Sequence, residues 1–274
     1  MTTLLIAASD LHINSTVAIC PPSVNLDDGG TYHASPGQLW LYRSWLEDCD
    51  KISKTNADRK VLVLNGDLGE LDTKRRSNQL VSPNKATVQA LVLTVLEPLL
   101  KVVDDIYIVR GTQAHVGKSG WLEEAIAQDI DGVKRDEKRG TASWWHIQGM
   151  IEGVRVDIAH HAGMGSQPWS KAGAIMTTAA RMTWQYAIDK GVQPPALAIR
   201  SHNHKKGDSG ENYPVRLFYT PCWSLITEYG YRTGRENDRP DIGLLLVHID
   251  GAEFESEYLI HRTTSEKRIW SVTL

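Results

Sequence analysis

The chain has 274 residues, of which 41% are hydrophobic and 23% charged, and its formal net charge is −3. This length and composition fit one ordinary globular unit, so we expect a single domain over residues 1–274. A charge so close to zero excludes a strongly basic nucleic-acid binder; a nucleic-acid partner stays open but is not indicated.

The three cysteines lie far apart, at positions 20, 49 and 222. They form neither a disulfide framework nor a paired-cysteine metal motif, which favours a reducing setting. The first residues lack a basic leader, and no run reaches ~18 uninterrupted apolar residues. We therefore expect a cytoplasmic location without a membrane partner. Nothing in the sequence indicates the oligomeric state.

The first half of the chain alternates apolar runs of strand length with helical patterns. A first strand over Leu4–Ala8 is followed by a helix that begins after Ser35, because Ser35 can cap it, Pro36 suits its first position and Gln38 can reach back. The buried stripe predicted for this helix is Tyr42, Trp45, Leu46, Cys49 and Ile52.

Further helices and strands are expected after this first pair. Helices are predicted from about Thr87 to Val102, where Pro98 should cause a kink or a break, near Trp121–Ile130, and from about Pro168 to Lys190. Strands are predicted at Val61–Leu64, Ile106–Val109, Val156–Ala159, Ala196–Ile199, Val215–Tyr219, Gly243–Ile249 and Glu253–Ile260, with a hairpin between Thr141 and Ala159. This order indicates an α/β protein with two packed sheets and helices outside.

Polar residues follow each of five apolar runs directly. The segments are Ser9-Asp10-Leu11-His12, Asn65-Gly66-Asp67-Leu68-Gly69-Glu70, Arg110-Gly111-Thr112-Gln113-Ala114-His115, His160-His161 and Ser201-His202-Asn203-His204. Because loops at the carboxyl ends of parallel strands converge in one crevice, these side chains should meet. Each segment alone is weak evidence. Charged and imidazole groups at so many buried strand ends, however, require an interaction that offsets the free-energy cost of their desolvation.

Divalent cations would provide that compensation. Carboxylate oxygen together with imidazole nitrogen suits Mn²⁺, Fe²⁺, Co²⁺ and Zn²⁺, whereas an all-oxygen set would suit Mg²⁺ or Ca²⁺. A carboxylate such as Asp67 can bridge two cations. Two cations ~3.5–4 Å apart can activate a water and neutralise phosphate oxygens, so that no protein nucleophile is required.

The ordered segments resemble the motifs of the calcineurin-like metallophosphoesterases over residues 9–204. The resemblance implies a four-layer α/β/β/α sandwich of two packed mixed sheets, with two divalent cations at one site; Mn²⁺ is the first choice, with Fe, Zn, Co and Ni as alternatives. It implies the ligands Asp10, His12 and His204 for one cation, His202 and His160 for the other, and Asp67 as the bridge. The start of the chain and the GTQAH segment look most like small bacteriophage members of this family.

The chain departs from the family pattern in three places. Ser201 replaces a glycine, which a turn accepts if its φ is negative. Where the family has Gly-Asn-His, this chain has GTQAH, so we expect Gln113 to supply the amide ligand of the second cation and His115 to act as general acid. His160 rather than His161 is expected to be the ligand, although the proline that usually follows this histidine is absent.

The predicted function is metal-dependent hydrolysis of a phosphate ester, as a phosphodiesterase or a phosphomonoesterase. A nuclease acting on DNA would use the same site residues, and the sequence does not separate these substrates. A mononuclear amide hydrolase would not need Asp10, His12, Asp67, His202 and His204 together. A non-catalytic module braced by metal remains an alternative because GTQAH is irregular.

An aromatic stretch includes Trp223 and Tyr231. We interpret it as packing in the core in preference to lining a pocket for the leaving group.

Overall fold

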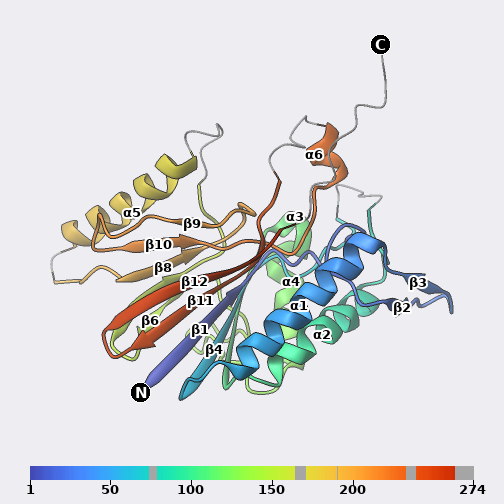
Figure 1. Ribbon diagram of the computed structural model, residues 1–274, viewed down its shortest axis with the longest axis horizontal. Coiled ribbons are helices and arrows are strands. Elements are labelled where there is room, and N and C mark those ends of the chain that lie inside the picture. Colours follow the sequence, from blue (N-terminus) through green and yellow to red (C-terminus); the bar gives the residue numbers. More distant parts are fainter. Residues whose placement is uncertain (74–78, 164–170, 190, 233–238, 263–274) are drawn as a thin grey trace, which may run out of the picture.

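The computed structural model describes residues 1–73, 79–163, 171–189, 191–232 and 239–262. Two five-stranded sheets face each other, and helices cover the outer face of each (Figure 1). This is the α/β class with two mixed sheets that the sequence predicts. In the described part of the chain, none of the helices combines the length and apolarity needed to cross a bilayer.

The first sheet has the strand order β12-β11-β1-β4-β5. Its parallel strands are β1 (Thr2–Ala8), β4 (Arg59–Asn65) and β5 (Asp105–Val109). The hairpin of β11 (Ile242–Asp250) and β12 (Glu253–His261) adds two strands, with β11 antiparallel to β1. The carboxyl ends of β1, β4 and β5 therefore lie at one edge of this sheet.

The second sheet has the strand order β6-β7-β8-β10-β9. Its parallel strands are β7 (Val154–Ile158), β8 (Leu197–Arg200) and β10 (Arg216–Tyr219), and its antiparallel edges are β6 (Ile147–Ile151) and β9 (Gly207–Asp208). The hairpin predicted around Glu152-Gly153 is formed by β6 and β7. A further small hairpin joins β2 (Ser23–Asn25) and β3 (Thr31–His33).

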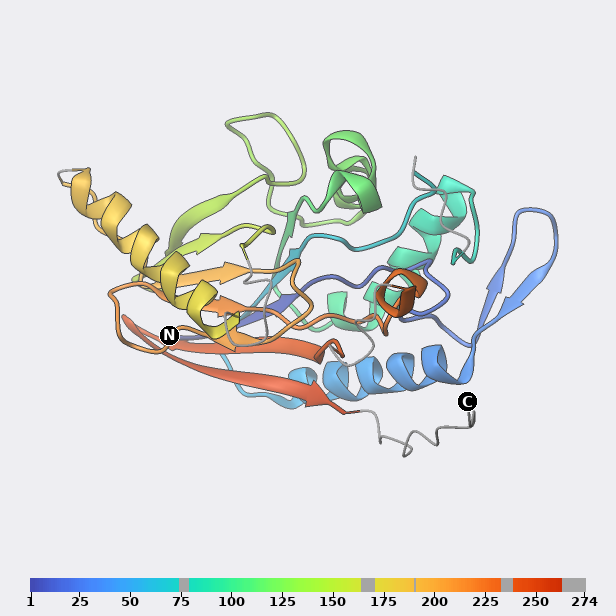
Figure 2. The same ribbon diagram turned by 90° about the horizontal axis from the view of Figure 1, so that it is seen from above.

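Three groups of buried apolar side chains lie between the four layers. The first lies between the first sheet and the helices α1 (Pro36–Lys54) and α2 (Lys85–Leu100). The second joins the facing sides of the two sheets, and the third lies between the second sheet and α5 (Lys171–Ile188). Figure 2 shows α1 and α5 on opposite sides of the sheets. The predicted α/β/β/α order of layers is thus confirmed.

The first helix has the predicted capping box at Ser35 and Gln38, but its buried face differs from the prediction. Leu41 is fully buried, whereas Leu46 is 37% exposed, so Leu46 was wrongly assigned to the stripe. Gln38, Leu41 and Trp45 follow one another at helical spacing and lie on the buried face of the helix. Leu46 lies outside that face. Trp45 meets Trp223 edge to face with ring centroids 5.1 Å apart, which confirms Trp223 as a core residue, whereas Tyr231 is 60% exposed and its assignment to the core is wrong.

The other predicted helices agree with the structure in position but differ from the prediction in detail. α2 continues through Pro98 to Leu100, so a break at Pro98 is wrong; the proline removes one N–H donor, and only Leu99 and Leu100 of the helix follow it. The predicted positions 168–170 and 190 at the ends of the last long helix lie outside the described residues. The helix predicted near Trp121 is α4 (Trp121–Asp129), and the short segments α3 (Gln113–Val116), η1 (Lys118–Gly120) and α6 (Glu228–Arg232) were not predicted.

Candidate metal centre

The loops that follow β1, β4, β5, β7 and β8 bring the predicted polar side chains together. Overlapping groups have potential ligand atoms within 4.8 Å of one another. Their members are Asp10, His12, Asp67, His115, His160, His161, His202 and His204. Seven of the eight predicted site residues are therefore neighbours, and His161 joins them. The carboxylates of Asp10 and Asp67 are fully buried, and they form the floor of the site.

The two carboxylates are held in the same way. Oδ2 of Asp10 accepts hydrogen bonds from Ser9 Oγ (2.7 Å) and from the His202 backbone N–H (3.1 Å), and Oδ1 of Asp67 accepts one from the Thr112 backbone N–H. The other oxygen of each, Oδ1 of Asp10 and Oδ2 of Asp67, is buried and has no hydrogen-bond partner among the described residues. A buried carboxylate oxygen without a partner is costly unless a cation lies against it.

The first group of ligand atoms surrounds Oδ1 of Asp10. His204 Nε2 lies 3.4 Å from this oxygen and His12 Nε2 lies 4.0 Å from it. The two imidazole nitrogens are 3.1 Å apart. Nδ1 of His12 lies 3.0 Å from Glu70 Oε2, and since a carboxylate accepts, the proton of neutral His12 belongs on Nδ1. Its Nε2 therefore presents a lone pair to the site.

The second group surrounds Oδ2 of Asp67. His160 Nε2 lies 3.1 Å from this oxygen and His202 Nδ1 lies 3.9 Å from it. His160 Nδ1 donates to the Asn65 carbonyl at 2.6 Å, so in its neutral form Nε2 is a lone pair facing a carboxylate oxygen. Two acceptors at this distance need a cation between them, either a proton or a metal ion.

The pKa values of His160, Asp10 and Asp67 are shifted in the direction that favours positive charge on the imidazole and negative charge on the carboxylates. Burial alone would lower the pKa of His160, but the contact with Asp67 and the charges of Asp10 and Asp67 outweigh burial and raise it to about 9. Burial alone would raise the pKa of Asp10, but the contact with His204 and the charge of His160 lower it to about 2. The pKa of Asp67 is held below its ordinary value against its burial by contacts with His160 and His202.

Glu70 is a site residue whose role the sequence did not reveal. Its carboxylate accepts from His115 Nδ1 (2.7 Å) as well as from His12 Nδ1, so it joins a predicted ligand to the predicted general acid. These two hydrogen bonds lower the pKa of Glu70 to about 2 although burial would raise it. Burial would lower the pKa of His115, but the bond to Glu70 and the charge of Asp67 raise it. The available signal was an acidic residue three positions after Asp67 in a strand-end segment.

The backbone of the site adopts conformations that side-chain-bearing residues rarely take. Among the described residues with positive φ other than glycine are five of the predicted ligands, with φ between 45° and 74°. These are Asp10, His12, Asp67, His202 and His204. Such conformations persist only where surrounding contacts impose them, and they are concentrated at functional sites. Here the Asp10 N–H donates to Gly66 O and the His12 N–H donates to Asp67 O, both at 3.0 Å.

Two glycines allow the β4 and β5 loops to approach each other. A Cβ on Gly111 would lie 2.2 Å from both the backbone N and Oδ1 of Asp67. A Cβ on Gly66, whose φ is +84°, would lie 2.5 Å from His160 Nδ1. No side chain fits at either position, so glycine is required for the Asp67 carboxylate to reach its place.

The departures from the family pattern have different outcomes. Ser201 is not among the residues with positive φ, so the condition for replacing glycine is met, and its Oγ accepts from Asn65 Nδ2 at 2.6 Å. Gln113 is exposed at the start of α3, and its side chain makes no hydrogen bond with the described residues. A ligand role for Gln113 therefore stays a prediction. The preceding Thr112 lies beside the histidines of the second group instead.

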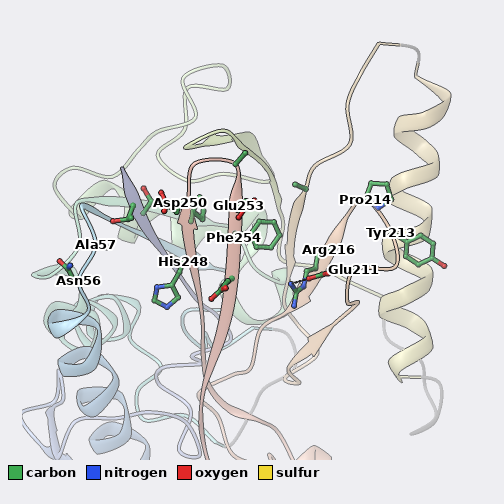
Figure 3. A pocket seen from close by; sticks show the side chains of 16 residues that line it. Asn56, Ala57, Glu211, Tyr213, Pro214, Arg216, His248, Asp250, Glu253 and Phe254 are labelled. Atoms are coloured by element: carbon green, nitrogen blue, oxygen red, sulfur yellow. Dashed lines mark hydrogen bonds and ion pairs between the residues drawn. The ribbon is translucent and has the colours of Figure 1, made fainter.

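A separate hollow of about 850 Å³ lies at the opposite end of the strands (Figure 3). Its lining includes Thr2 and Thr3 at the start of β1, whereas the site follows the end of β1. Four of its sixteen lining residues are acidic, and its Arg216 is already paired with Asp208 (2.8 Å) and Glu211 (3.2 Å). The hollow therefore offers an anionic ligand little positive charge, and the groups of potential metal ligands lie at the other end of the strands.

No protein-family description and no curated protein matches this chain. Among solved structures it is similar to Vps29 of Chaetomium thermophilum, with 10% identity, 94% of this chain and 98% of that chain covered, and a TM-score of 0.45. It is similar to a dimetal phosphatase from Danio rerio (8% identity, 93% and 98% covered, TM-score 0.44) and to a phosphatase from Mycoplasma pneumoniae (8% identity, 95% and 94% covered, TM-score 0.41). With TM-scores below 0.5, these likenesses do not bear on function, which must be inferred from the side chains of the site.

Proposed function

We propose that this chain is a divalent-metal-dependent phosphoester hydrolase of the calcineurin-like kind, and that the bacteriophage type is its place within that family. One observation carries the proposal: two buried carboxylates each present an oxygen without a partner to a ring of imidazoles. Carboxylate oxygen and imidazole nitrogen together fit borderline divalent cations. The layers of the fold and the order of the strand-end segments agree with the resemblance that the sequence shows.

The residues would divide into two ligand sets that share one carboxylate. Asp10, His12 and His204 would hold the first cation, and His160 and His202 the second. Asp67 would serve both, since its Oδ2 faces the second set and one of its carboxylate oxygens lies within 4.8 Å of a ring nitrogen of His12. When bound, two such cations lower the pKa of an attached water and neutralise the charge on phosphate oxygens.

The protein itself supplies the proton for the leaving group. Nδ1 of His115 is held by Glu70, so its Nε2 is the nitrogen available to a substrate. The side chain is 24% exposed, at the rim above the buried carboxylates, where an ester oxygen can reach it. Because Glu70 raises the pKa of His115, the imidazole holds its proton until the phosphorus–oxygen bond breaks. Glu70 is thus a positioning residue for the acid.

The test of the proposed function is hydrolysis by the purified protein with and without chelator. Substrates are p-nitrophenyl phosphate, bis-p-nitrophenyl phosphate, cyclic nucleotides and single- and double-stranded DNA, and their relative rates decide between monoesterase, diesterase and nuclease. We expect chelation to abolish activity and Mn²⁺ to restore it better than Ca²⁺, which fits imidazole ligands poorly. Equal rates with and without chelator would refute the proposal.

A second experiment tests the role of His115. A poor leaving group needs a proton and a good one does not, so His115→Ala should slow alkyl or nucleotide esters by about 10²–10⁴-fold and p-nitrophenyl esters far less. Metal content should not change. His248→Ala is the matched control, because His248 lies in the hollow at the far end of the strands (Figure 3). Equal slowing of both ester types, with loss of metal, would show His115 to be a ligand.

A further inference from the structure

The second group of ligand atoms contains more imidazole than the resemblance implies. His161 was expected to stay outside the site, yet its ring nitrogen lies within 4.8 Å of those of His160 and His202. Its ring centroid is 4.9 Å from that of His160 and 4.9 Å from that of His202. Three ring nitrogens this close together can serve as ligands of one cation, because each imidazole can present a nitrogen lone pair to it.

The hydroxyl of Thr112 lies among these three rings. Oγ1 of Thr112 is 3.4 Å from His160 Nε2, 3.3 Å from His161 Nε2 and 3.1 Å from His202 Nδ1. A hydroxyl has one proton, so it can donate to one of the three nitrogens only, and the other two face its oxygen. The Thr112 backbone N–H is fixed by Asp67, which holds the hydroxyl at the centre of this group.

The neighbouring Gln113 does not take part in this arrangement. It directly follows Thr112, but its side chain is exposed at the first residue of α3. Thr112, and not Gln113, is therefore the residue of this segment whose side chain reaches the second group.

We infer that the second cation site is completed by His161 and Thr112 in place of Gln113. Its donors are then the imidazoles of His160, His161 and His202, the shared Asp67 carboxylate and the Thr112 hydroxyl. This inference rests on the proposed two-cation function and specifies the ligands of the second cation, where the GTQAH segment departs from the family motif. The first site has two imidazoles and the second has three, so the second should select Zn²⁺ or Co²⁺ over Mg²⁺ more strongly than the first.

The inference is tested by metal binding, without reference to turnover. The purified 274-residue chain is stripped with chelator and titrated with Zn²⁺ or Co²⁺. Bound metal per chain and the two dissociation constants are measured, and the visible spectrum of Co²⁺ reports on the coordination geometry. His161→Ala and Thr112→Val remove one donor each, and Gln113→Ala is the matched control. His161 is exposed, so its replacement should leave the melting temperature of the metal-free protein unchanged.

We expect wild type and Gln113→Ala to bind two cations alike. His161→Ala should bind the first cation normally and the second at least about tenfold more weakly, since even loss of a ligand's outer partner costs about 10–100-fold. Thr112→Val should weaken the second step in the same direction. Unchanged second binding in His161→Ala would overturn the inference, and so would a rise in KM with metal content intact, which would make His161 a substrate contact.

The outcomes separate this inference from the proposed function. If the protein hydrolyses phosphate esters and His161→Ala keeps both cations at wild-type affinity, the inference fails and the proposed function stands. If wild type binds two cations, His161→Ala loses the second, and no phosphate ester is hydrolysed, the proposed function fails and the site assignment stands.

Discussion

The buried carboxyl of Glu123 should make the stability of the metal-free protein depend on pH. Glu123 lies on α4 behind the β4 loop and is fully buried. Its Oε1 accepts a long hydrogen bond of 3.4 Å from the Leu68 backbone N–H, and its Oε2 has no hydrogen-bond partner among the described residues. Burial, with the nearby charge of Asp67, raises the pKa of Glu123 from 4.5 to about 8.

The direction of the effect follows from this raised pKa. Below the unfolded value of 4.5 the carboxyl is protonated in both states and costs nothing through ionisation. As the pH rises toward 8, the unfolded chain releases the proton while the folded chain keeps it, so folding loses stability. The loss is about 1.4 kcal/mol for each pH unit, or about 2 kcal/mol between pH 6 and 7.5, and about 5 kcal/mol in all as an upper bound.

The assay is urea unfolding in chelator at several pH values, for wild type and for Glu123→Gln. The variant keeps the shape of the side chain but cannot ionise, so its stability relative to wild type should rise by about 2 kcal/mol from pH 6 to 7.5. Groups common to both proteins cancel in this difference. Parallel stability profiles for the two proteins would refute the reasoning.

The adjacent Glu124 is the matched control. Its carboxylate accepts from Arg110 Nη2 (3.0 Å), Ser143 Oγ (2.5 Å) and the Ala142 backbone N–H (2.9 Å). Burial would raise its pKa, but these bonds lower it to about 2, so its contribution is present above pH 4.5 and is lost only as pH falls toward 2. Glu124→Gln should therefore lower stability by a constant amount between pH 6 and 7.5.

Three other predictions concern the site. Added metal should raise the melting temperature of the stripped protein, because a cation at 100 times its Kd stabilises the folded state by about 2.7 kcal/mol; a melting curve indifferent to millimolar Mn²⁺ would argue against a formed site. Asp67→Asn should reduce kcat more than loss of any single terminal ligand, since a neutral amide bridges two cations poorly, and a near-wild-type rate would exclude a bridge. Gly111→Ala should abolish activity because its Cβ would lie 2.2 Å from Asp67 N and Oδ1, while Gly149→Ala, whose Cβ meets nothing within 4 Å, should not.

Much of the fold was predictable because it depends on local patterns. The parallel strands β1, β4 and β8 are short apolar runs whose residues are mostly buried on both faces, which gives a signal that does not depend on their partners. The cap at Ser35 is equally local, since Gln38 is its neighbour in the helix. Leu46 shows the limit: the direction of a helix face depends on the sheet below it, and one residue at the rim was assigned to the wrong side.

The sequence alone determined which residues could meet at the site, because strand order places loop residues at one edge whatever their exact geometry. Asp10, Asp67 and the histidines of the last strand-end segment are examples. What each side chain does there was decided by the tertiary structure. Thr112 rather than Gln113 lies among the histidines, and the pairing of Glu70 with His12 and His115 joins segments up to 58 residues apart.

The physical reason is that a ligand's direction depends on backbone angles that its own residue type does not favour. Asp10, His12 and Asp67 take positive φ because hydrogen bonds between the β1 and β4 loops hold them there, and Gly66 and Gly111 let the loops approach. Those contacts exist only after the sheet has formed. The local sequence therefore indicated which residues lie at the site. Their individual roles depend on the close approach of loops that are distant in the chain.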